Sequence, residues 1–207
     1  MRAILVSNPK GGSGKTTLAV NLAGLLASRG ERTSLWDLDW QRSSFEWLSL
    51  RSKDLPRVSR LDTRDDEDPK LPRGDRWLVL DSPAGLRGKN LAHALKPAHK
   101  VLVPIQPSLF DMAAAQDFLA VLADEKAVRK HRTFVGIVAM RVDARTRAAA
   151  TLETFLRQFE LPVVTFLRDT VLYANAALAG RSIFDLAPSL VERDVEQWQP
   201  LIDWLES

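Results

Sequence analysis

Residues 2–18 read RAILVSNPKGGSGKTTL, and this stretch decides the fold class. The apolar run at 2–7 predicts a short strand, and the segment 15–29 carries leucines at helical spacing. The glycines between them let the backbone turn its N–H groups inward, and the start of a helix adds a positive dipole end. A strand, a glycine-rich turn and a helix in this order predict a phosphate-binding loop. The alternative is a glycine-rich turn that binds no ligand.

The residue types in this turn suit a nucleoside triphosphate with Mg²⁺. Lys15 can reach the β- and γ-phosphates, the Thr16 hydroxyl can ligate Mg²⁺, and Thr17 can donate to the α-phosphate. Pro9 stands where the usual pattern G-x-x-x-x-G-K-[ST] has its first glycine, and a second lysine, Lys10, follows it. The predicted nucleotide-binding residues of the turn are Gly11, Gly12, Ser13, Gly14, Lys15, Thr16 and Thr17.

Strands and helices alternate along the rest of the chain. Further strands are predicted at 33–38, near 57–61, and at 77–80, 101–105, 134–140 and 163–166. Helices are predicted at 41–50, 110–130, 145–159, 171–179 and 189–206, and the remainder of 51–76 as loop. Apolar strands between amphipathic helices indicate a doubly wound α/β fold, a mostly parallel sheet with helices on both faces. We expect residues 1–207 to form one domain.

Two predicted strands end in carboxylates, which places acids at the same edge of the sheet as the phosphate-binding loop. Asp37 and Asp39 share one face of their strand, and Asp81 follows the apolar run WLVL at 77–80. An acid in the position of Asp81 can hold Mg²⁺ through a water molecule. The simpler alternatives are that Asp39 caps the helix at 41–50 and that Asp81 opens a turn.

Composition and charge restrict the class of protein further. The chain has no cysteine, which excludes disulfides and thiolate metal sites, and its three histidines are too scattered for a convincing zinc site. No apolar run is long enough to span a bilayer and no signal peptide is evident, so we expect a cytoplasmic protein. Residues 126–147 are basic and 185–207 acidic, which indicates either a polyanion-binding face or ordinary solvated helices.

The motif KGGSGKTT at 10–17 resembles the deviant Walker A motif of the ParA/MinD ATPases, a branch of the P-loop NTPases. LWDLDWQ at 35–41 is similar to the D-x-D-P-Q motif of that family, with Trp40 in place of proline, and DSPAG at 81–85 to its Walker B segment. Weaker similarity covers 101–112, 136–149 and 167–189, where Asn175 stands in place of the usual glutamate. The resemblance therefore extends over nearly the whole chain.

This resemblance implies a Mg²⁺-dependent ATP hydrolase that binds ATP or ADP. It implies that Lys10 reaches into the partner subunit's nucleotide site in an ATP-bound homodimer, and that Asp39 orients the attacking water. The expected catalytic residues are thus Lys10, Lys15 and Asp39, and the metal would be held by Thr16 and, through water, by Asp81. Arg141 or Asp143 is expected to contact the base or ribose. For Lys10, the alternative is that it is an ordinary solvated lysine of the loop.

Resemblance to the short ParA proteins, which lack an N-terminal DNA-binding domain, also implies partners. The ATP dimer would bind DNA nonspecifically on the nucleoid, and a ParB-type partner would stimulate hydrolysis during plasmid or chromosome partition. Positioning of a protein cargo, such as a chemotaxis cluster or carboxysome, and a metabolic P-loop enzyme remain alternatives. The mainly acidic polar residues of the last helix disfavour membrane binding. The expected DNA contacts are Arg147, Arg168 and Arg181.

Overall fold

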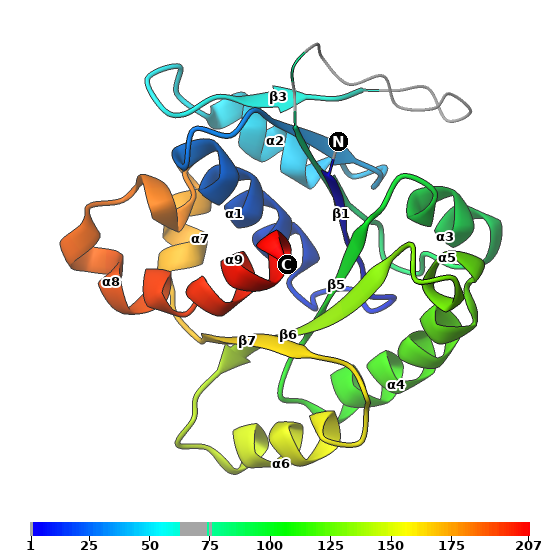
Figure 1. Cartoon of the computed structure of the whole chain (residues 1–207). Coiled ribbons are helices and arrows are strands. Elements are labelled where there is room, and N and C mark those ends of the chain that lie inside the picture. The colour runs from blue at the N-terminus through cyan, green and yellow to red at the C-terminus, as the bar shows by residue number, and fades with distance from the viewer. Residues whose placement is uncertain (1, 63–73, 75) are drawn as a thin grey trace.

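A seven-stranded sheet, in the order β3-β2-β4-β1-β5-β6-β7, organises the computed structural model, which describes residues 2–62, 74 and 76–207 (Figure 1). All of its neighbouring strands are parallel. The strands are β1 (Arg2–Val6), β2 (Thr33–Asp37), β3 (Val58–Arg60), β4 (Trp77–Asp81), β5 (Lys100–Ile105), β6 (Phe134–Val142) and β7 (Val163–Arg168). This arrangement confirms the predicted doubly wound α/β fold.

Helices cover both faces of the sheet (Figure 1). The first face packs against α1 (Lys15–Ser28), α2 (Ser43–Leu50), α7 (Leu172–Ala177), the 3₁₀ turn η1 (Ile183–Asp185), α8 (Pro188–Glu196) and α9 (Gln199–Glu206). The second packs against α3 (Gly88–Leu95), α4 (Leu109–Asp124), the short α5 (Lys126–Arg129) and α6 (Arg147–Leu156). Because side chains alternate along a strand, Ile4 and Val6 of β1 enter the first core and Ala3 and Leu5 the second.

Several predicted boundaries are wrong. Helix α3 was not predicted, although Leu91, Ala94 and Leu95 lie at helical spacing and are buried. The predicted helix 110–130 breaks at Glu125, whose backbone is extended. The predicted helix 189–206 breaks before α9, which has a proline in its first turn, where the missing N–H costs nothing. The predicted loop at 63–73 and 75 lies outside the described residues.

The apolar side of the C-terminal helix α9 is part of the first core. Leu201, Ile202 and Leu205 are buried there, next to the fully buried Trp198, whose indole N–H donates to the Tyr173 hydroxyl. The apolar residues of this helix are therefore packed on the domain. Among the described residues, no helix is both long and apolar enough to cross a bilayer.

Helix α2 is fixed at both ends. At its first turn, Asp37 of β2 accepts hydrogen bonds from the backbone N–H groups of Ser44 and Phe45. At its end, the Arg51 guanidinium makes two hydrogen bonds to the buried Asp185 carboxylate. Gly180, with φ of +62°, packs so tightly here that a Cβ would lie 2.4 Å from the backbone nitrogen of Arg51. Helix α2 is therefore held in place at both its start and its end.

Arg51→Ala should lower the free energy of unfolding by about 3 kcal/mol or more, because it leaves the Asp185 carboxylate buried without its cation. Arg51 and Asp185 side chains are only 4% and 1% exposed. Urea unfolding measures the loss. The control is Arg29→Ala, which breaks an exposed pair with Glu206 and should cost less than about 1 kcal/mol. Equal losses in the two variants would contradict the assignment of Arg51.

Candidate nucleotide-binding site

The turn from β1 to α1 has the backbone that the glycine pattern predicts. Gly12 and Gly14 have φ values of +79° and +96°, where side chains are strained, and a Cβ on Gly14 would lie 3.1 Å from the Met140 side chain. Gly11 differs, because φ is not positive and a Cβ there would meet nothing within 4 Å. No neighbour among the described residues requires glycine at Gly11, whereas close approach of a phosphate would.

Hydrogen bonds hold this turn against β5 and against the segments that follow β4 and β5. The Asn8 side chain donates to the Pro104 carbonyl oxygen at 2.8 Å, and Gln106 donates to that of Gly12 at 2.6 Å. From the other side, the Gly85 backbone N–H donates to the Pro9 carbonyl oxygen at 2.8 Å. These hydrogen bonds tie the turn to the neighbouring strands and so contribute to its shape.

Lys15 lies inside the turn and is 7% exposed. Its ammonium group donates to the Lys10 carbonyl oxygen at 2.9 Å, and the buried Ser13 hydroxyl donates to the same oxygen. Burial lowers the pKa of Lys15, and the nearby carboxylates of Asp81 and Asp39 raise it in part. The structure thus brings together the cation and the two acids that the sequence predicts to work as one site.

Asp81 is the most constrained acid of the site. It ends β4 opposite Asp37 of β2, is 1% exposed, and has one carboxylate oxygen without a hydrogen-bond partner in the described part of the chain. Burial, followed by the charge of Asp37, raises the pKa of Asp81 to about 7, although a hydrogen bond from Thr16 and the charge of Lys15 oppose this. An unpartnered buried carboxylate oxygen beside a threonine hydroxyl suits a hard cation such as Mg²⁺.

Asp39 is half-buried at the end of the same edge. Its carboxylate accepts a hydrogen bond from the Gln41 backbone N–H at 3.0 Å, and Asp37 instead of Asp39 binds the first N–H groups of α2. The alternative in which Asp39 caps that helix is therefore wrong. Trp40, the departure from the family motif, is 85% exposed beside it.

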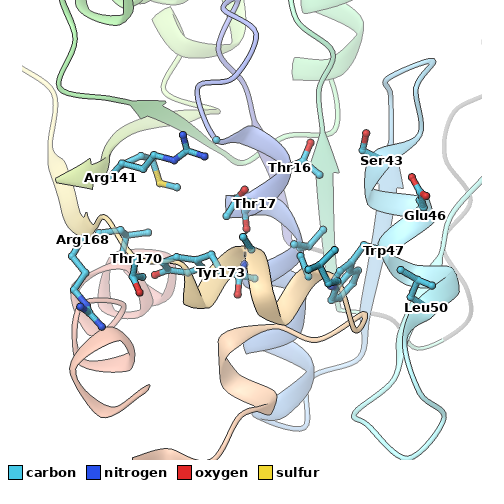
Figure 2. A pocket seen from close by; sticks show the side chains of 18 residues that line it. Thr16, Thr17, Ser43, Glu46, Trp47, Leu50, Arg141, Arg168, Thr170 and Tyr173 are labelled. Carbon is cyan, nitrogen blue, oxygen red and sulfur yellow. Dashed lines mark hydrogen bonds between the residues drawn. The ribbon is translucent and has the colours of Figure 1, made fainter. Parts of the chain in front are cut away.

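A cavity of about 380 Å³ opens beside the first turn of α1. Figure 2 shows Thr16 and Thr17 on α1, Arg141 on β6 and Tyr173 on α7 around it. An irregularity in the β6–β7 register and a φ of +52° place Arg141 there. Asp143 does not line the cavity. Its carboxylate accepts hydrogen bonds from the exposed Arg145, which lower the pKa of Asp143 to about 2.

Further cavity residues were not found by sequence reasoning. Among them are Met140, Leu167 and Thr170. These three lie at or just after the carboxyl ends of β6 and β7, where ligands of open α/β sheets bind. Position along the strands was therefore the signal that could have identified them.

The remaining predicted basic residues differ in how far their charge is available. Arg168 makes two hydrogen bonds, at 2.6 and 2.8 Å, to the Asp194 carboxylate, which is fully buried. Arg147 and Arg181 are exposed, and no ion pair to either occurs within residues 2–62, 74 and 76–207. Lys10 forms an ion pair with Asp111 at the start of α4.

A parallel sheet with this phosphate-binding turn and two acids at neighbouring strand ends defines a P-loop nucleotide-binding protein. Residues 4–183 match the family model described as the CobQ/CobB/MinD/ParA nucleotide binding domain, and the chain belongs to this family. Its ParA/MinD resemblance is thereby confirmed, and with it membership of a family of ATPases.

Two curated relatives are similar over most of the chain. The maintenance of carboxysome distribution protein A of Gloeobacter kilaueensis is 32% identical over 190 residues, 88% of this chain and 83% of that protein. The chromosome-partitioning ATPase Soj of Thermus thermophilus is 30% identical over 224 residues, 91% of this chain and 90% of that protein. Among solved structures, an ATP complex of Cyanothece McdA has the same fold, with a TM-score of 0.73, 14% identity and coverage of 97% and 96%.

Asp81→Asn should change how stability depends on pH when metal and nucleotide are absent. The pKa of Asp81 is about 7 in the folded chain and 3.8 as the ordinary value, so folding takes up a proton between these pH values. Wild-type stability therefore falls as pH rises through this window. Asparagine does not ionise, so the variant should gain roughly 2–4 kcal/mol relative to wild type between pH 5 and pH 8. Urea unfolding in EDTA tests this, and parallel pH profiles would refute it.

Proposed function

We propose that the chain is a Mg²⁺-dependent ParA-type ATPase that forms an ATP-dependent homodimer, binds nucleoid DNA nonspecifically and moves a cargo with a partner that stimulates hydrolysis. The observation that carries this proposal is the combination of Lys10 and Lys15 on one glycine turn, with Asp39 and Asp81 at its edge. The similarity to Soj, over nine-tenths of each protein, supports the partition role with a ParB-type partner.

Each group of the site then has a defined part in ATP hydrolysis. Lys15 and the N–H groups of the turn bind the β- and γ-phosphates, and Thr16 and Asp81, through water, would hold Mg²⁺. Mg²⁺, when bound, neutralises charge on the phosphates. Asp39, half-exposed at the rim, orients the attacking water, and Lys10 adds its charge to the partner subunit's site. Arg141 and the cavity beside Thr17 would receive the base and ribose.

Asp39→Ala tests the assignment of the water-orienting residue. The variant should bind ATP and dimerise like wild type, because Lys15 and Thr16 remain, while hydrolysis falls by about 100-fold or more. Phosphate release and ATP titration measure the two properties. Asp54→Ala, which removes an exposed acid after α2, is the control and should hydrolyse at the wild-type rate. Wild-type hydrolysis in Asp39→Ala would show that another group orients the water.

Positioning of a protein cargo is a second candidate function. It is favoured by the similarity to the carboxysome distribution protein, which is as close as the similarity to Soj. Deleting the gene in its host separates the two functions. Loss of a plasmid or chromosome from daughter cells indicates DNA partition, whereas normal DNA inheritance with misplaced protein assemblies indicates cargo positioning.

DNA binding should depend on Arg147 and Arg181, which are exposed, more than on Arg168, whose charge already faces Asp194. Pairing two subunits joins two weak basic surfaces into one bivalent site, which explains why ATP would switch binding on. Affinity should be indifferent to sequence and fall with salt by a log–log slope of about −0.9 per phosphate contacted.

Arg147→Ala or Arg181→Ala removes two contacts from a dimer, so the salt slope should shrink by roughly 2. Fluorescence anisotropy at several salt concentrations, with ATP and with ADP, measures it. Arg29→Ala, whose charge is paired with Glu206, is the control and should keep the slope. Equal, salt-insensitive binding with both nucleotides would remove the support for a DNA-bound state.

A further inference from the structure

We propose that Asp111 is a positioning residue for Lys10: it holds the Lys10 ammonium on its own subunit and so sets the protein concentration at which two ATP-loaded subunits pair. The inference rests on the proposed function, in which Lys10 acts in the partner's nucleotide site. It concerns the regulation of that site by a residue of α4, which lies outside the phosphate-binding turn and the two acidic strand ends.

The contact itself is buried on the side of the carboxylate. Asp111 lies in the first turn of α4 and is 2% exposed, while the Lys10 side chain is 35% exposed. One oxygen of Asp111 accepts hydrogen bonds from the Lys10 ammonium and from the Ser108 hydroxyl. The other oxygen is buried and has no partner among the residues that the structure describes. Lys10 is therefore the main compensation for this buried charge.

The topology shows that the contact turns Lys10 away from the acids of its own site. Asp39 follows β2 and Asp81 ends β4, on one side of β1 in the sheet, whereas Asp111 follows β5 on the other side. Lys15, five residues further on, lies near Asp81 and Asp39. The two lysine side chains of this turn therefore interact with acids on opposite sides of β1. Lys10 pairs with Asp111, whereas Lys15 lies near Asp81 and Asp39.

Holding Lys10 has an energetic consequence for pairing. Under this proposal, the Lys10 ammonium group leaves Asp111 when it reaches a phosphate of the partner subunit. When Lys10 leaves, Asp111 stays buried with one hydroxyl donor, and an uncompensated buried charge is unfavourable. The triphosphate in the partner's site must outweigh this loss, so Asp111 opposes pairing until ATP is bound.

Asp111 could alternatively serve only the start of α4, where an acid interacts well with the helix dipole. That role is separable, because Ser108, whose hydroxyl oxygen accepts from the Asp111 backbone N–H, caps α4 independently of the carboxylate. Asp111→Asn keeps the volume and an oxygen that can accept from Ser108, and it removes the charge that holds Lys10.

The test compares wild type, Asp111→Asn and the matched control Asp117→Asn, which removes an exposed acid from the same helix. Reductive methylation of the nucleotide-free chain, followed by mass spectrometry, measures how accessible the Lys10 amine is. Sedimentation equilibrium with Mg²⁺ and the non-hydrolysable analogue AMPPNP measures the protein concentration at the midpoint of dimerisation. ADP affinity is measured alongside, because it reports on the intact monomer site.

In Asp111→Asn we expect Lys10 to be labelled several times faster and the dimerisation midpoint to fall about tenfold, with ADP affinity unchanged. Asp117→Asn should match wild type in all three. A wild-type chain that stays monomeric with AMPPNP overturns the proposed function and the inference with it. If wild type dimerises, unchanged Lys10 labelling or an unchanged or higher midpoint in Asp111→Asn overturns the inference alone. Asp111→Ser, which removes the same charge, is the second variant should Asp111→Asn not fold.

Discussion

Two buried carboxylates on neighbouring strands, Asp37 and Asp81, are the constraint on which the rest of the site depends. Like charges at paired positions in a dry interior repel each other, and each needs its own compensation. Asp37 obtains it from the first N–H groups of α2, which fixes that helix on the sheet and leaves Asp39 at the rim. The charge of Asp81 is compensated only in part, by Thr16 and Lys15. A bound cation next to the Asp81 carboxylate would therefore be favourable.

Local signals were sufficient for the centre of this structure. The glycine turn, the apolar run before it and the acids after 33–38 and 77–80 are read within a few residues, and the fold class follows from their alternation. Contacts between distant residues could not be predicted this way. One example is the start of α2, where Asp37 and not Asp39 accepts the first N–H groups, after a turn in which Arg42 has a φ of +52°. Lys10 and Asp111 are 101 residues apart, and no spacing rule relates them.

The acidic segment at the end of the sequence is explained by its ion pairs in the folded chain. The acidic segment 185–207 supplies partners for three arginines elsewhere in the chain: Asp185 binds Arg51, Asp194 binds Arg168, and Glu206 binds Arg29. The acidic segment therefore pairs with three of the 29 basic residues, and two of these pairs have a buried carboxylate. A surface that binds phosphates has to be sought among cations without such partners, which is why a count of basic residues along the sequence could not separate Arg147 and Arg181 from Arg168.

The two lysines of the turn, Lys10 and Lys15, carry the same charge but lie in different surroundings. Lys15 is buried, hydrogen-bonded to the Lys10 carbonyl oxygen and close to the acids, so its charge belongs to its own site. The backbone of Lys10 is thus part of the surroundings of Lys15, and a second ammonium group in the same place would repel the first. Asp111, beyond β5, gives the Lys10 side chain a partner on the opposite side of β1. A glycine turn can carry two lysines because separate carboxylates hold their charges apart.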